Sequence, residues 1–96
     1  MREYEIMLIL PPDAEDSAVD AVVERITGIL AERGGEVGQV DKWGRRRLAY
    51  EIAHHNEGYY VIVRFTAEPG AIPELDRILS LADEVVRFKV VLRHAA

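Results

Sequence analysis

Cysteine is absent from this chain of 96 residues. Without a thiol, the chain can form neither a disulfide framework nor a thiolate metal site. Long apolar runs are missing too, since no stretch approaches the roughly 20 residues that a membrane-spanning helix requires. Arg2, Glu3 and Glu5 interrupt the only early apolar segment, and no small-residue cleavage site follows it. We therefore expect a soluble cytoplasmic protein without a secretory signal or a membrane partner.

Side chains suited to nucleophilic or metal chemistry are scarce. The two serines, Ser17 and Ser80, fall at predicted helix positions, and the single asparagine, Asn56, falls in a predicted loop. His54 and His55 are adjacent, but neighbouring side chains of an extended chain point apart and no further ligand cluster accompanies them. We expect no catalytic residue, no metal, no cofactor and no small-molecule substrate.

Positive charge is in deficit overall, because 12 basic residues stand against 17 acidic ones and the net charge is -5. This balance argues against a general nucleic-acid binder, whose affinity comes mostly from neutralising phosphates. The distribution is uneven, however. Residues 1–40 carry three basic and nine acidic groups, whereas residues 41–64 carry five and three. An acidic body with local basic segments fits docking at one defined site.

Hydrophobic periodicity predicts six elements in one domain that covers residues 1–96. Period-2 alternation predicts strands at residues 2–10, 36–52, 58–67 and 85–93. Spacing by three and four predicts two helices, one ended by Gly34 and Gly35, the other ending near Asp83. Ser17 and Asp20 are predicted to form a capping box at the start of the first helix.

The order strand, helix, strand, strand, helix, strand predicts an α+β fold, the ferredoxin-like βαββαβ sandwich. Right-handed crossovers would place both helices on one face of a four-stranded antiparallel sheet, with the first and third strands central. The other face, which we call the open face, would then be free. We expect this face, rather than a pocket, to make the functional contacts.

The second strand changes periodicity along its length. Val37 is odd-numbered, whereas the later positions Leu48, Tyr50 and Ile52 are even-numbered. One residue of slip is required, and a bulge at Gly44 is the simplest device, although a turn at residues 43–45 is an alternative. With the bulge, the even-numbered residues from Leu48 onward face the core, Arg45 and Arg47 project onto the open face, and Arg46 lies at the bulged end.

The open face is thus predicted to have an apolar centre between cationic edges. Its centre would hold Met7, Ile9, Tyr60 and Ile62. Its edges would hold Arg45 and Arg47 on one side and Arg87, Lys89 and Arg93 on the other.

Three consecutive arginines, residues 45–47, form the most concentrated group of positive charges in the sequence. A guanidinium group offers a planar fork of donors to phosphate, and a neighbouring Trp43 or Tyr50 could provide a surface on which bases stack. Charges also protect edge strands from pairing with other chains. The residues alone leave both interpretations open.

The sequence resembles the family of the sixth protein of the bacterial small ribosomal subunit. The similarity spans nearly the whole chain, and its motifs are M-R-x-Y-E-I at the start, D-x-W-G-R-R-x-L-A-Y-x-I at 41–52, G-Y-Y-V at 58–61 and V-x-R-x-K-V-V-L-R at 85–93. The resemblance implies a ferredoxin-like, non-enzymatic component of the cytoplasmic ribosome. It also implies binding to the central domain of 16S ribosomal RNA together with the subunit's eighteenth protein.

Carried over by position, the resemblance implies roles for individual residues. The candidates for RNA contact are Arg2, Arg45, Arg46, Arg87, Lys89 and Arg93. Arg45 and Arg46 could instead touch the partner protein, whose expected surface comprises Met7, Ile9, Trp43, Arg47, Tyr60 and Ile62. Tyr50 is expected in the core. The alternative function is a protein-interaction or regulatory module that acts through the open face.

Overall fold

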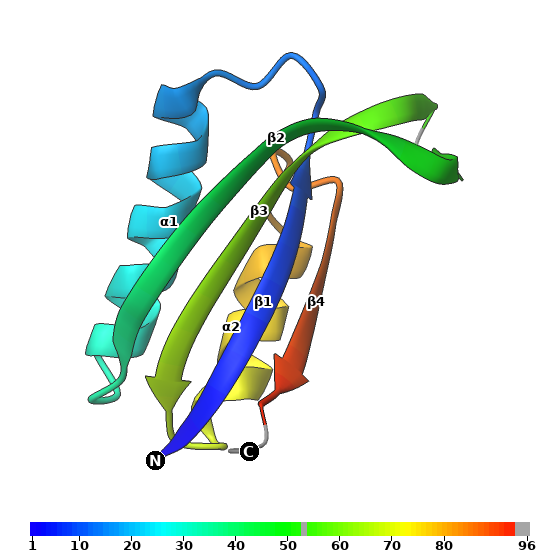
Figure 1. Cartoon of the computed structure of the whole chain (residues 1–96). Helices are drawn as coiled ribbons and strands as arrows, with labels where there is room; N and C mark the ends of the chain where they lie inside the picture. Colours follow the sequence, from blue (N-terminus) through cyan, green and yellow to red (C-terminus); the bar gives the residue numbers. More distant parts are fainter. Residues whose placement is uncertain (53, 94–96) are drawn as a thin grey trace.

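The computed structural model describes residues 1–52 and 54–93. Four strands form one sheet in the order β2-β3-β1-β4, every neighbouring pair is antiparallel, and both helices lie on the same side of it (Figure 1). The elements are β1 (Arg2–Leu10), α1 (Asp16–Ala31), β2 (Glu36–Ile52), β3 (His55–Ala67), α2 (Ala71–Ser80) and β4 (Arg87–Leu92). The predicted ferredoxin-like fold, with β1 and β3 central, is confirmed.

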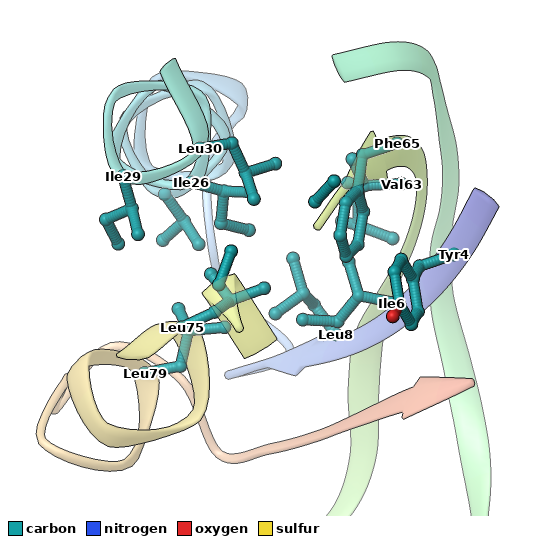
Figure 2. Close-up of a cluster of buried hydrophobic side chains, with 14 of the residues drawn as sticks. Tyr4, Ile6, Leu8, Ile26, Ile29, Leu30, Val63, Phe65, Leu75 and Leu79 are labelled. Atoms are coloured by element: carbon teal, nitrogen blue, oxygen red, sulfur yellow. The ribbon is translucent and has the colours of Figure 1, made fainter. Parts of the chain in front are cut away.

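The hydrophobic core fills the space between the sheet and the helices (Figure 2). Alternate residues of β1 and β3 face it, and the rings of Tyr4 and Phe65 stack with centroids 5.5 Å apart. From the helices come Val19, Val22, Ile26, Ile29, Leu30, Leu75 and Leu79. The stripes predicted from three-and-four spacing therefore pack as expected. No helix of the described residues is long and apolar enough to cross a membrane.

The start of α1 differs from the prediction. Glu15 is the N-cap residue and makes no side-chain capping hydrogen bond, so the predicted capping box of Ser17 and Asp20 is wrong. The carboxylate of Asp20 instead lies 2.7 Å from the ammonium group of Lys42 on β2. Asp20 therefore forms an ion pair with the sheet and takes no part in capping the helix.

Helix α1 ends where the sequence predicts, whereas helix α2 ends earlier. Gly34 has a φ of +76°, and the amide of Gly35 donates to the carbonyl of Leu30 at 2.7 Å, which closes α1 as predicted. Helix α2 ends at Ser80, earlier than the expected end near Asp83.

Strand β2 has three register shifts against β3 where one was predicted; the third lies between Arg47 and Ile52, and the first two are one-residue slips. Its register against β3 shifts between Val37 and Gln39 and again between Lys42 and Gly44. The two slips cancel, so odd-numbered residues face the helices again and Arg45 pairs with Tyr59. The prediction that Arg45 and Arg47 project onto the open face is therefore wrong. Arg46, opposite Gly58, lies on that face.

The predicted loop at residues 54–58 is mostly strand. His54 alone keeps a turn conformation, with a φ of +66°, and β3 begins at His55. Strand β4 is shorter than the predicted 85–93.

The end of β2 and the start of β3 extend beyond the rest of the sheet. The pairing of β1 with β3 stops at Leu10 and Tyr59, so residues 46–52 and 54–58 are not paired with any residue of β1. We call these two segments the hairpin. In Figure 1 the hairpin curves past the ends of β1 and β4.

Candidate nucleic-acid interface

The open face takes its side chains from all four strands. Residues paired directly across antiparallel strands share a face, so the register defines its members. They include Glu3, Glu5, Met7, Ile9, Asp41, Arg46, Gly58, Tyr60, Ile62, Arg64, Thr66, Arg87, Lys89 and Val91. The face therefore combines an apolar middle with charges of both signs.

The apolar middle is less accessible than predicted. Ile9 is 4% exposed and Ile62 is 7% exposed, so neither offers much surface to a partner. Met7 and Tyr60 are half-buried. The expected bare apolar centre is thus reduced to these two side chains.

Gly58 allows the base of the hairpin to pack against the open face. A β-carbon at this position would lie 2.5 Å from Cγ2 of Ile9 and 3.5 Å from Cδ2 of Leu48. Leu48 is 7% exposed, but it is buried on the side away from the helices, not in the main core as predicted. The close approach of Gly58 to Ile9 explains part of the burial of Ile9.

Replacing Gly58 with Ala is expected to lower the free energy of unfolding by about 1–3 kcal/mol, because the new methyl group overlaps the branched side chain of Ile9. Urea unfolding followed by circular dichroism measures the change. The matched control is Gly28→Ala in α1, where a β-carbon meets nothing within 4 Å. There we expect a gain of about 0.5–1 kcal/mol from helix propensity. Equal midpoints for the two variants would contradict close packing at Gly58.

Cations at one end of the open face are neutralised. Oε2 of Glu5 lies 3.7 Å from Nε of Arg64 and 3.8 Å from Nε of Arg93. A shallow depression of 440 Å³ beside them also contains Glu3 and Glu36. This end offers both signs of charge, and its arginines are already engaged by a carboxylate.

Cations at the opposite end of the open face are not neutralised in this way. Arg46, Arg87 and Lys89 are all exposed. Within residues 1–52 and 54–93, none of the three has a carboxylate oxygen within 4 Å. Arg87 lies opposite Ile9 and Lys89 opposite Met7, so the two project from the same face of β4. Positive charge is therefore concentrated where the hairpin meets β4.

Two exposed aromatic rings accompany these cations. The guanidinium carbon of Arg46 lies 5.6 Å from the ring centroid of Trp43, which is 53% exposed. Nη1 of Arg87 donates to the hydroxyl oxygen of Tyr50 at 3.3 Å. Tyr50 is 63% exposed, so its predicted place in the core is wrong. We call Trp43, Arg46, Tyr50, Arg87 and Lys89 the cationic aromatic surface.

The other candidate residues lie elsewhere. Arg45 is on the helix side of the sheet, where its Nε lies 3.6 Å from Oε2 of Glu57. Arg47 pairs with Glu57 on that side as well. Arg2 is seven positions from Ile9 along β1, about 23 Å at the usual rise per residue. The structure thus brings together only half of the predicted RNA-contacting residues.

Lys42 was not singled out from the sequence, although it belongs to the basic segment. Its hydrogen bond to Asp20 raises the pKa of Lys42 above the ordinary lysine value. The side chain is thereby held toward α1, away from the open face. No sequence pattern marks this pair, because its members are 22 positions apart on different elements.

Comparison with known proteins shows similarity along nearly the whole chain. The profile of the family described as Ribosomal protein S6 matches residues 3–92. Small ribosomal subunit protein bS6 of Moorella thermoacetica is 43% identical over 90 residues, covering 94% of this chain and 92% of that protein. Its counterpart in Mycolicibacterium paratuberculosis is 50% identical over 91 residues, covering 95% of each. The crystal structure of 30S ribosomal protein S6 from Thermotoga maritima superposes with a TM-score of 0.85 at 32% identity, covering 96% of this chain and 87% of that one.

Proposed function

The chain belongs to the ribosomal protein S6 family, and we propose that it binds small-subunit ribosomal RNA together with the subunit's eighteenth protein. Family membership makes the chain a component of the small ribosomal subunit in the cytoplasm, and not an enzyme. The RNA-binding surface and the partner are our proposals. They extend the predictions made from the sequence.

The observation that carries the proposal is the gathering of Arg46, Arg87 and Lys89 at one end of the open face. Exposed cations without nearby carboxylates can neutralise phosphates without first breaking an ion pair. Arg87 and Lys89 are two positions apart on β4 and project from the same face, so both can contact one RNA backbone. We assign the main phosphate contacts to these three residues.

The remaining candidates have weaker support. Arg93 shares the carboxylate of Glu5, and Arg45 faces the helix side, so either would have to change partner or contact a second surface. Arg2 lies at the far end of β1, where it could contact RNA only through a second patch. These three stay predicted RNA contacts outside the group formed by Arg46, Arg87 and Lys89.

A protein partner is needed because the chain as a whole is acidic. With a net charge of -5, long-range repulsion opposes the approach of RNA, and three local cations offset it only in part. A basic partner protein would supply further neutralisation. Met7 and Tyr60, the accessible remainder of the apolar middle, are our candidates for its contact, with Ile9 and Ile62 supporting them from beneath.

The proposal is tested by equilibrium binding to a labelled central-domain fragment of small-subunit ribosomal RNA. Three titrations are compared at fixed salt: this protein alone, the eighteenth protein alone, and the two mixed. We expect tight binding only in the mixture. Failure of the mixture to bind, while this protein is folded and associates with itself, would instead favour the protein-interaction module.

A further inference from the structure

Tyr50 is exposed in a place where the fold does not require an aromatic residue. The hairpin already packs on the sheet where Gly58 lies against Ile9, and Tyr50 remains 63% exposed. Covering the apolar face of this ring with a flat apolar group of a ligand would be favourable. The side chain nevertheless has a defined position, because its hydroxyl oxygen accepts a hydrogen bond from Arg87.

The surroundings of Tyr50 are cationic. Arg87 holds its hydroxyl group, and Lys89 follows two positions later on the same face of β4. On the hairpin side, Arg46 lies over the exposed ring of Trp43. An occupant of this surface should therefore be negatively charged and should also carry a flat apolar group.

An unpaired nucleotide of RNA has both properties. Its phosphates match the cations, and its base presents a flat face that stacks on aromatic side chains. Bases inside a double helix hide their faces in the stack, so a helix could use only the cations. An acidic peptide would satisfy the charges but would leave the aromatic rings uncovered. The combination favours single-stranded RNA.

We propose that Tyr50 is a stacking platform for an unpaired base, with Arg46, Arg87 and Lys89 contacting the flanking phosphates. This inference rests on the proposed RNA binding and adds to it the class of nucleotide recognised and the residue that recognises it. The hydrogen bond from Arg87 makes the platform preorganised, because the ring is positioned before RNA arrives. Binding then requires little ordering of the hairpin side chain.

The test compares Tyr50→Leu and Tyr50→Phe with the unaltered protein, each mixed with the eighteenth protein and titrated with the labelled central-domain RNA at several salt concentrations. Loss of one stacked base should weaken binding by roughly 5- to 150-fold in Tyr50→Leu. Tyr50→Phe keeps the ring and should stay within about threefold. The slope of log affinity against log salt concentration should be the same in all three, because stacking releases no counterions.

The outcomes separate this inference from the proposed function. If the unaltered protein binds the RNA and Tyr50→Leu binds it equally well, the stacking platform is overturned and the RNA-binding function stays intact. Equal losses in Tyr50→Leu and Tyr50→Phe would also overturn it, since the hydroxyl tether to Arg87 would then be the important feature. Absence of binding by the unaltered mixture would overturn both. Thermal unfolding of each variant, expected to be unchanged at this exposed position, controls for folding.

Discussion

Replacing Leu75 with Ala is expected to lower the free energy of unfolding by about 2–5 kcal/mol. Leu75 is 0% exposed on α2 and belongs to the cluster in Figure 2, where side chains of α2 face those of α1 and the central strands. Helix α2 has only 10 residues, too few to be stable without packing. Truncation therefore leaves a cavity and weakens the attachment of the helix. A loss of this size is a large fraction of the roughly 5–15 kcal/mol that stabilises a typical domain.

Leu81→Ala is the matched control, since it makes the same chemical change one residue after α2 at a position that is 72% exposed. We expect a change within about 0.5 kcal/mol there. The free energy of unfolding of both variants is measured by urea unfolding, with the same dependence on urea concentration used for each. A Leu75 variant as stable as the Leu81 variant would contradict the assigned packing of α2.

Reversing both charges in the double variant Arg87→Glu/Lys89→Glu is expected to weaken RNA binding by the mixture with the eighteenth protein by at least about 100-fold at 0.1 M salt. The substitution removes two proposed phosphate contacts and places two carboxylates against the RNA backbone. The slope of log affinity against log salt concentration should fall by about 2, one for each lost contact. Filter binding or fluorescence anisotropy across a salt series gives both quantities.

The double variant Arg33→Glu/Arg77→Glu changes the net charge equally at two exposed positions outside the open face. Its affinity should stay within about threefold of the wild type, because exposed charges more than a Debye length away are largely screened. Similar losses in both double variants would show that only net charge matters. That result would contradict a localised phosphate-binding site on β4.

Local sequence pattern predicts most of the architecture. The alternation of Tyr4, Ile6 and Leu8, and the spacing of Ile26, Ile29 and Leu30, each reflect one buried face of one element. Such patterns depend on neighbours in the chain, so they can be read from sequence. The element order then restricts the topology strongly, because right-handed crossovers leave few alternatives.

The errors share a different physical origin. The prediction for Arg45 and Arg47 assumed one bulge, whereas a second bulge after Val37 reversed the alternation again. A glycine permits a bulge but does not require one, and the choice is made by pairing with β3. A distant contact also explains the error at Asp20, which forms an ion pair with Lys42 and does not cap the helix.

The amino-acid sequence is sufficient to identify the six elements, the topology and the family of this protein, and to mark its basic segments. It does not determine which arginines act together. Arg46 and Arg87 share a surface only because two slips in β2 cancel and the hairpin curves to bring Tyr50 to β4. These features depend on register and packing between residues distant in the chain. Contacts between distant residues determine the register of β2 and the path of the hairpin, so both are known only from the tertiary structure.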